Sequence, residues 1–453
     1  MTAQLLRILM CALLCSIPAQ AADRYLRVGA TGSNNGTDWT NAWTVLSTAE
    51  TNLARGDVLY VADGTYSEGS RVTFNVAASG TTLITVKKAT VSAHGTATGW
   101  SDTFGDGQAV FTMALYFLTD YWTFDGVVGG GPTDWEGAVT AFGFKLDGDC
   151  IILDQDNSVN GGDNLTYQHF ETDGHASGTP SSNCPGLQIR QNNNLTIRYF
   201  YIHHINEDVF KLADGGSDII VEYGKTKLAP IEQDGTHHGD LFECANSTWN
   251  RITIRWSFFE DAVGSYLFGA HETCTVNDYF IYGNILDFRT REQNTGNCQF
   301  GHLSGGGTIN NIKAYNNTIA GIFGASCFAF YSPWTGTPSD VSNNIWVEIT
   351  AASYTFSFSS VTHTTNTCYE VNGNPCEQNL TGSPFVNYST QNYSLSSSAN
   401  TAQTAGTILG TPFNVDMLGV TYGGDGKWNR GALEFDEGAP QATTGSGRLR
   451  RLR

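Results

Sequence analysis

Short segments in which apolar and polar residues alternate recur along the middle of the chain. Between residues 195 and 347 they read LTIRYFYI, IIVEYGKT, ITIRWSFF, YFIYGNIL, IKAYNNTI and DVSNNIWV. A period of two is typical of β-strands with one buried face. Steps of 20 to 45 residues between such strands predict a solenoid, in which each repeat buries its apolar face on the next. Equivalent inward positions can be placed at Ile197, Val221, Ile254, Ile281, Ala314 and Val341, in steps of 24, 33, 27, 33 and 27.

A second column of outward positions supports this arrangement. Because its steps nearly match those of the inward column, we expect the repeats to be successive coils of parallel strands. The longer steps insert charged residues and histidines, and solenoids commonly place ligands beside such loops. Asn316-Asn317 and Asn343-Asn344 stand at matching turns, where we expect a ladder of stacked amides. The outward column is assigned to Gln188, Lys211, Glu243, Phe268, Gln299 and Ala329, in steps of 23, 32, 25, 31 and 30.

The N-terminal part of the mature chain has a different pattern. An amphipathic piece from Trp43 to Leu53 is followed by Gly56-Asp57 and an apolar strand from Val58 to Ala62. From Tyr25 to Tyr66 this order resembles the entry of the right-handed parallel β-helix proteins of the pectate-lyase-like superfamily. The resemblance implies an all-β, single-domain right-handed parallel β-helix, a solenoid with an N-terminal cap and a C-terminal closing segment.

The predicted boundaries follow from these patterns. We expect an N-terminal cap and first strands over 22–82 and the parallel β-helix over 83–350. The last coils and the C-terminal closing segment, which ends in WNRGALEF, are expected over 351–437. Residues 438–453 end in an arginine-rich run and are predicted to be a disordered basic tail.

Residues 1–21 are predicted to be a signal peptide. Arg7 precedes an apolar run from Ile8 to Ile17, and Ala19-Gln20-Ala21 provides a cleavage motif. The run is too short to span a membrane, which needs about 20 apolar residues. We therefore expect a secreted protein, extracellular or periplasmic, with no membrane span.

The cysteine count fits an oxidising compartment. Two of the ten cysteines lie in the signal peptide, which leaves eight, enough for four disulfides. Cys368 and Cys376 are predicted to pair, since only seven residues separate them. For Cys244, Cys298 and Cys327 two alternatives stay open: disulfides, or buried thiols in the inward stacks.

Charge limits the partners. The 453-residue chain has a formal net charge of −19, which argues against nucleic acid and anionic membrane surfaces. An acidic polymer would need local cations or a bound metal to approach such a surface. We expect no nucleic-acid partner, and a monomer.

Two segments of the chain share one pattern that suggests a site. Asp208 begins the segment DVFKL, and Asp240 begins DLFEC. Strand alternation turns the two phenylalanines inward and places Lys211 and Glu243 on one outer face. Neighbouring strands lie about 4.8 Å apart, so the polar groups would share one patch. Asp208, Asp240 and Glu243 are predicted to hold Ca²⁺, because close carboxylates are typical ligands of hard cations.

The same segments support a functional hypothesis. NEDVFKL and GTHHGDLFE are similar to segments that pectate-lyase-like enzymes present in a groove on one parallel sheet. That superfamily holds mostly polysaccharide lyases and glycoside hydrolases. The resemblance implies a secreted polysaccharide-degrading enzyme, and we predict a lyase that cleaves an acidic, uronate-containing polysaccharide by β-elimination. A glycoside hydrolase and a non-catalytic carbohydrate-binding or surface solenoid stay open as alternatives.

β-Elimination needs a group that neutralises the sugar carboxylate and a base that removes the adjacent proton. Lys211 is assigned as the base. His238 competes for this role, because an unperturbed imidazole pKa of about 6.5 needs less adjustment. Arg289 is the third predicted catalytic residue and would grip a substrate carboxylate. The predicted substrate-binding residues are His237, Arg291, Gln299 and His302.

Alternatives without catalysis exist for several of these residues. Lys211 and Glu243 are also spaced for a salt bridge between neighbouring coils. His203 and His204 stand at a turn, and we expect them to be structural.

Overall fold

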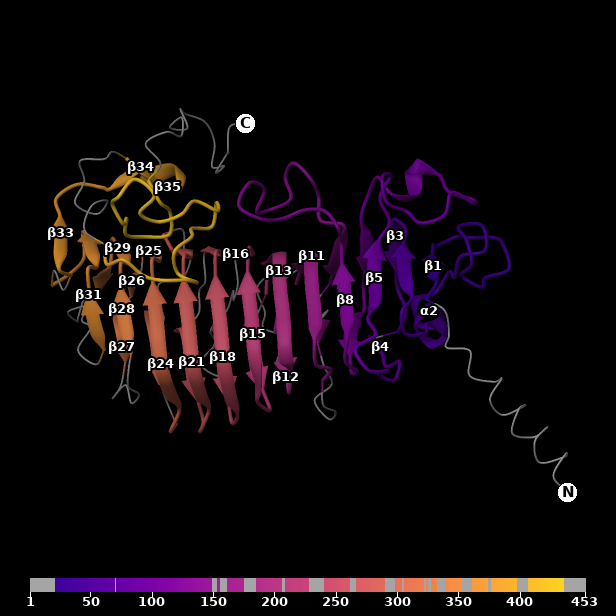
Figure 1. Ribbon diagram of the computed structural model, residues 1–453, viewed down its shortest axis with the longest axis horizontal. Helices are drawn as coiled ribbons and strands as arrows, with labels where there is room; N and C mark the ends of the chain where they lie inside the picture. Colours follow the sequence, from indigo (N-terminus) through magenta and orange to yellow (C-terminus); the bar gives the residue numbers. More distant parts are fainter. Residues whose placement is uncertain are drawn as a thin grey trace, which may run out of the picture.

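The structure, a computed structural model, is a stack of short strands along one long axis, with the N-terminal cap at one end and the C-terminal segments at the other (Figure 1). It describes residues 21–69, 71–148, 153–154, 161–174, 185–205, 208–227, 240–260, 266–289, 298–303, 305–321, 323–324, 327–331, 339–351, 361–373, 376–396 and 406–435.

The larger sheet, sheet A, consists of two columns of parallel strands that meet at a bend. β11 (Leu165–Asp173) and β13 (Asn193–His203) run through both columns. The other strands of the first column are β1 (Asp23–Leu26), β2 (Val58–Val61), β5 (Ile84–Lys88), β8 (Trp122–Asp125), β15 (Gly216–Glu222), β18 (Thr248–Arg255), β21 (Thr275–Tyr282), β24 (Thr308–Tyr315), β28 (Asp340–Ser342) and β31 (Thr362–Thr364). The second column adds β3 (Gly64–Tyr66), β6 (Ala109–Phe111), β9 (Phe144–Asp147), β16 (Lys225–Lys227), β19 (Phe258–Glu260), β22 (Ile285–Asp287), β25 (Thr318–Ala320), β29 (Ile345–Val347), β32 (Thr367–Tyr369) and β33 (Gln378–Leu380).

A second parallel sheet, sheet B, closes each coil on the remaining side. Its strands are β4 (Arg71–Phe74), β7 (Ala114–Phe117), β10 (Leu153–Asp154), β12 (Leu187–Arg190), β14 (Phe210–Ala213), β17 (Phe242–Ala245), β20 (Tyr266–His271), β23 (Cys298–Leu303) and β27 (Cys327–Tyr331). Two short strands, β26 (Phe323–Gly324) and β30 (Thr350–Ala351), form a further parallel pair. Because the chain passes through sheets A and B in turn from β2 to β27, the predicted all-β parallel β-helix is confirmed.

The core confirms the predicted inward column at every position. Ile197 pairs with Val221, and the register continues through Ile254, Ile281, Ala314 and Val341. All six side chains are 0% exposed. The alternation of apolar and polar residues predicts these buried positions correctly because each aliphatic side chain packs on the equivalent side chain one coil away. The inside of the helix is therefore one continuous apolar stack.

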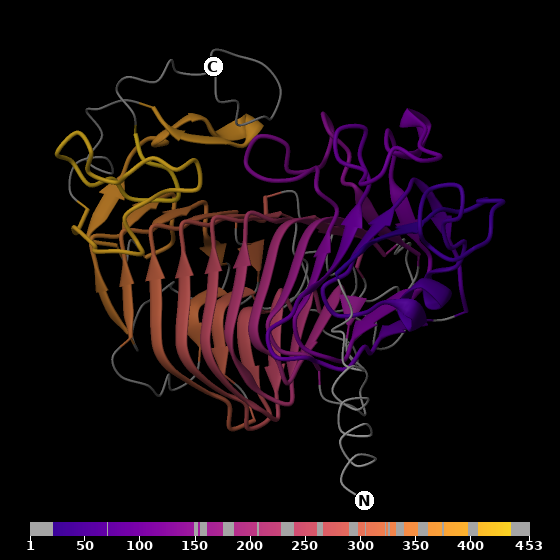
Figure 2. The same cartoon turned by 45° about the vertical axis from the view of Figure 1, so that its right-hand side comes forward.

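The two ends of the stack are covered by other elements. A single α-helix in the described part of the chain, α2 (Leu46–Asn52), packs Leu46 and Ala49 against the first coils. At the other end, the antiparallel hairpin of β34 (Phe385–Asn387) and β35 (Asn392–Leu395) lies over the outside of the strands (Figure 2). No helix in the described ranges is long and apolar enough to cross a membrane.

Two disulfides are present among the described residues. Cys368 pairs with Cys376, as predicted. Cys244 pairs with Cys274, which decides between the two alternatives for Cys244 in favour of a disulfide. Cys298 and Cys327 lie opposite one another on β23 and β27, and their side chains are outside the description.

Candidate functional site

The candidate site lies on the outer face of sheet B, where three neighbouring strands carry charged side chains. Lys211 on β14 is in register with Glu243 on β17, and Glu243 is in register with Gly269 on β20. The residues before them, Phe210 and Phe242, stack in the core with ring centroids 4.5 Å apart. Because successive side chains of a strand point to opposite faces, Lys211 and Glu243 point outward, as predicted.

Lys211 joins two carboxylates. Its Nζ lies 3.3 Å from Asp208 Oδ2 and 3.3 Å from Glu243 Oε2. The backbone N–H of Asp240 donates to Asp208 Oδ1 at 2.8 Å. Asp208 and Asp240 are 1% and 0% exposed, whereas the Lys211 side chain is 27% exposed. The structure therefore brings these four predicted residues together, with the ammonium group on the solvent side.

The proximity of the carboxylates changes their proton affinities. Burial, followed by the hydrogen bond to and charge of Glu243, raises the pKa of Asp208 well above its usual value. Burial also acts to raise the pKa of Glu243, but the hydrogen bond from Asp208 and the charge of Lys211 outweigh it and lower that pKa to about 2. The two carboxyl groups therefore differ in proton affinity, which is raised at Asp208 and lowered at Glu243.

A histidine that the sequence analysis missed completes this cluster. His271 Nε2 lies 3.3 Å from Asp240 Oδ2, and both side chains are buried. A Cβ at position 269 would lie only 2.5 Å from His271 Nε2, so glycine leaves the space that the imidazole occupies beside Glu243. Burial acts to lower the pKa of His271, but the hydrogen bond and charge of Asp240 outweigh it, and the pKa is raised.

The predicted outward column is right for three coils and wrong beyond them. Phe268, assigned to the fourth position, is in register with Phe242 and lies in the core. With Phe268 in place of Gly269 as the outward position, the sequence analysis did not consider His271, which lies two residues beyond Gly269 on the same face. The observed register runs from Gln188 through Lys211 and Glu243 to Gly269, and the backbones of His302 and Tyr331 continue the same row.

The remaining predicted residues are dispersed or not described. The backbone of His302 lies in the Lys211 row, two coils beyond Glu243, and Gln299 lies three residues earlier on the same strand. Arg289 follows β22 and donates from Nε and Nη2 to Asp287 at 2.9 and 2.8 Å, while its guanidinium lies 4.0 Å from the Tyr388 ring. No described contact joins Arg289 to Lys211. His237, His238 and Arg291 lie outside the described residues.

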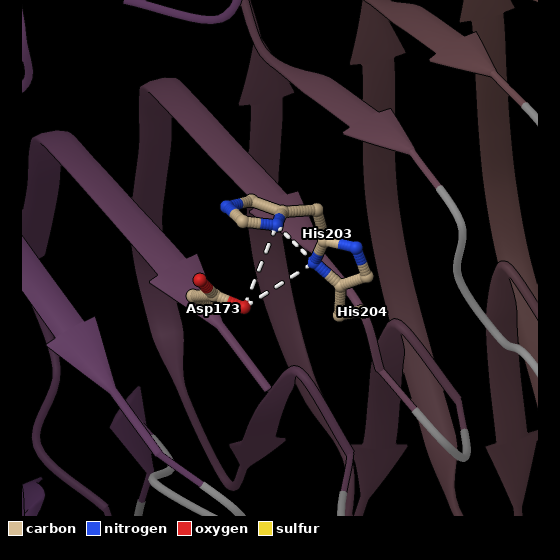
Figure 3. A group of neighbouring side chains, drawn as sticks. All are labelled: Asp173, His203 and His204. Carbon is tan, nitrogen blue, oxygen red and sulfur yellow. Dashed lines mark hydrogen bonds and ion pairs between the residues drawn. The ribbon is translucent and has the colours of Figure 1, made fainter. Parts of the chain in front are cut away.

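A second polar cluster lies at the ends of β11 and β13 in sheet A. Asp173, His203 and His204 form one group whose ligand atoms all lie within 4.8 Å of one another (Figure 3). Within the described residues, Asp208, Asp240 and Glu243 do not meet that criterion. The two clusters are close along the chain, since His204 precedes Asp208 by four residues.

The donors on sheet B fit a hard cation in their chemistry. Asp208, Asp240 and Glu243 offer carboxylate oxygens, the ligands that Ca²⁺ prefers. Burial, and then the charges of Glu243 and Asp240, raise the pKa of Asp208, and a divalent cation beside these carboxylates would offset the charge contribution. Between Asp208 and Glu243, the Lys211 ammonium group supplies the balancing positive charge in the structure.

Comparison with known proteins gives the fold. The sequence matches no protein-family model, and no curated protein matches it. Among solved structures, pectate lyase Pel9A matches with a TM-score of 0.56 and 15% identity, over 92% of this chain and 98% of that one. A PL6 family alginate lyase, AlyGC, matches with a TM-score of 0.39 and 12% identity, over 79% of this chain and 53% of that one. A mannuronic acid specific family 6 lyase from human gut microbiota gives 0.40 and 12%, over 74% and 75%. The first similarity confirms the β-helix fold that the sequence predicted.

Proposed function

We propose that the chain is a secreted polysaccharide lyase that cleaves an acidic, uronate-containing polymer by β-elimination on the outer face of sheet B. The observation that carries this proposal is that Lys211 Nζ lies 3.3 Å from both Asp208 and Glu243, in a side chain that is 27% exposed. A lyase base must meet the substrate while its own charge is controlled by fixed neighbours. Of the residues predicted for the base, Lys211 is the one that the structure describes in such a position.

The reaction would proceed as a proton transfer coupled to bond cleavage. Lys211, once neutral, takes the proton from the carbon next to the sugar carboxylate. The electron pair of that C–H bond forms a carbon–carbon double bond as the glycosidic C–O bond breaks, and the leaving oxygen gains a proton. His271 is the candidate donor, because Asp240 raises its pKa and favours the protonated imidazole.

Calcium would supply one element of this chemistry. Bound by Asp208, Asp240 and Glu243, it would neutralise the uronate carboxylate and so make the adjacent C–H bond more acidic. Such a cation also answers the problem of approach, because a chain of net charge −19 repels a polyanion.

Export of the protein is part of the proposal. The predicted signal peptide lies outside the described residues. The Cys244–Cys274 and Cys368–Cys376 disulfides support an oxidising compartment, where such bonds persist.

The test is an assay of the purified mature chain on uronate-containing and neutral polysaccharides, with calcium or with a chelator. We expect unsaturated products from a uronate polymer, lost with chelator. Lys211→Ala should lower turnover by about a hundredfold or more, the usual size of a general-base contribution. Lys313→Ala is the matched control, since Lys313 lies on β24 over the Phe280 ring, in the other sheet, and should leave turnover unchanged.

Each other outcome has a definite meaning. Full turnover by Lys211→Ala would remove the lysine from the scheme and make His238 the next substitution. New reducing ends without unsaturated products would indicate a hydrolase. No product from any polymer would favour a binding solenoid.

A further inference from the structure

The cluster at the ends of β11 and β13 has a backbone feature that brings two imidazoles together. His203 is the last residue of β13, and His204 follows it with a φ of +52°. Consecutive side chains of a regular strand would point to opposite faces. The left-handed conformation of His204 instead turns its ring back, so that the Nδ1 atoms of the two rings lie 2.6 Å apart (Figure 3).

The third member approaches both rings from the neighbouring coil. Asp173 is in register with His203, and its Oδ1 lies 3.6 Å from His203 Nδ1 and 3.3 Å from His204 Nδ1. Two tetrahedral ligands at the usual zinc distances of 2.0–2.1 Å are about 3.3 Å apart. The distance from Asp173 to His204 already has this length, the distance from Asp173 to His203 is about 0.3 Å longer, and the nitrogen–nitrogen distance needs to open by about 0.7 Å.

We propose that Asp173, His203 and His204 bind a divalent transition metal of the zinc type, with water at a fourth position. Two imidazole nitrogens and one carboxylate oxygen form a donor set that suits Zn²⁺ rather than Ca²⁺, which takes oxygen ligands. The site is separate from the one proposed for Ca²⁺ and does not depend on lyase activity.

An outer layer of side chains supports these ligands. His203 Nε2, the ring nitrogen that faces away from the cluster, lies 3.1 Å from Glu171 Oε1. Such a carboxylate fixes the ring and its tautomer and leaves Nδ1 for the metal. Asp173 is oriented similarly, because its second oxygen lies 3.3 Å from Lys145 Nζ.

Charge and access agree with a cation at this corner. Lys145 also lies 3.0 Å from Asp147 Oδ1 and 3.5 Å from Glu171 Oε1, so one ammonium group faces three carboxylates. These four groups together carry a net charge of −2. His204 has a side chain that is 40% exposed, which gives an ion a path from solvent.

The site would act as a clamp on the turn that enters the sheet B cluster. Residue 204 lies four positions before Asp208, and a Cβ at Gly174 would lie 2.3 Å from the His204 carbonyl oxygen. A metal that ties β11 to His204 would fix the backbone four residues before Asp208, which precedes β14 (Phe210–Ala213).

The first test is a calorimetric titration of the purified mature chain with Zn²⁺, in the presence of Ca²⁺. The second is the visible absorption spectrum of the same chain with Co²⁺ bound in place of Zn²⁺. We expect one tight equivalent in the wild type. His204→Asn should weaken it by at least about tenfold, since asparagine tolerates a positive φ but removes the imidazole. Glu171→Gln should weaken it about tenfold to a hundredfold, the usual effect of losing an outer carboxylate.

The matched control is His363→Asn, which removes another imidazole hydrogen-bonded to a carboxylate, at 2.6 Å from Glu377. It should leave Zn²⁺ affinity unchanged. Equal affinity in the wild type and His204→Asn, or no tight equivalent at all, would overturn the proposal. Circular dichroism spectra that match the wild type would show that each variant is folded. The single variant Asp173→Asn should lose the Co²⁺ bands, which gives an independent readout.

Discussion

Two buried polar columns cross neighbouring coils of this β-helix, and they differ in charge. The first is an amide ladder at the bend of sheet A, and the second is the Asp208–Lys211–Glu243 cluster on sheet B. In the ladder, Asn317 Oδ1 accepts from both the backbone N–H and the Nδ2 of Asn284, each at 3.1 Å, and Asn317 Nδ2 donates to Ile281 O at 2.8 Å. The ladder amides, all 0% exposed, are Asn284, Asn317, Asn344 and Asn366.

The contrast shows how to separate a structural polar column from a functional one. Each ladder amide has both a donor and an acceptor, so neighbouring amides can hydrogen-bond to one another. The column therefore carries no charge and can satisfy its own hydrogen-bonding groups. On sheet B, burial and then the neighbouring Glu243 raise the pKa of Asp208, so the two carboxyl groups do not satisfy one another as the amides do. Buried charges of this kind add little to stability, and this supports the role proposed for them above.

The largest expected effect comes from breaking the ladder. Asn317→Ala removes the acceptor for the Asn284 N–H and the donor to Ile281, and leaves both buried groups without these partners. At about 1–3 kcal/mol for each unsatisfied group, the free energy of unfolding should fall by about 3 kcal/mol. Urea unfolding measures it, and polysaccharide cleavage by the folded fraction should be unchanged.

A partly exposed amide column provides the control. Asn310 Nδ2 donates to Asn277 Oδ1 at 2.8 Å on the outside of β24. Asn310→Ala should cost no more than about 1 kcal/mol, since water can replace the lost hydrogen bond. If both variants lost the same stability, the ladder would have no special role.

The ladder and the inward column could be predicted because they depend on local, repeated patterns. Ile197 to Val341 follow strand alternation, and Asn317 and Asn344 stack as the matching turns suggested. The first member of each Asn pair behaves differently. Asn343 has a φ of +60° and accepts from Thr407 in the C-terminal segment, a contact between residues 64 positions apart that no repeat pattern contains.

The site was predictable only as far as the repeat stays regular. Asp208, Lys211 and Glu243 come from two coils with the same spacing, so their meeting followed from the register. His271 reaches the same row from two residues beyond it, through the space above Gly269. Asp173 and His204 meet because the backbone of His204 has a positive φ, which no sequence pattern predicts here.

A smaller effect of opposite sign is expected from neutralising the sheet B cluster. Asp208→Asn keeps an oxygen for the Asp240 N–H and cannot ionise. Burial, and then Glu243, raise the pKa of Asp208 in the folded state, so the wild type loses stability as pH rises above the unfolded pKa, until the folded pKa is reached. The variant should therefore be more stable by about 1 kcal/mol at neutral pH, and equal to the wild type below the unfolded pKa of about 3.9.

The same variant should lose lyase activity, because a carboxylate ligand and the partner of Lys211 disappear together. Stability and turnover would then move in opposite directions, as in sites that sacrifice stability for function. Thermal unfolding across this pH range and the polysaccharide assay measure the two quantities. A variant that is less stable than the wild type at neutral pH would show that Asp208 is a structural residue, like the ladder amides.

The smallest effect concerns His271, the imidazole of the sheet B cluster. Its folded pKa is raised, despite burial, by Asp240, so the imidazolium stabilises the fold below about pH 6.5 and this contribution is lost as pH rises through the folded value. His271→Gln removes that dependence. We expect the difference of about 1 kcal/mol in the free energy of unfolding between slightly acidic and alkaline pH to disappear.

His363→Gln is the control, at an exposed pair with Glu377. It should change the pH profile less, because surface ion pairs contribute little. Unfolding midpoints measured from about pH 6 to 9 would decide the matter. An unchanged pH profile in His271→Gln would mean that His271 is not protonated beside Asp240. Another residue would then have to be the proton donor of the proposed reaction.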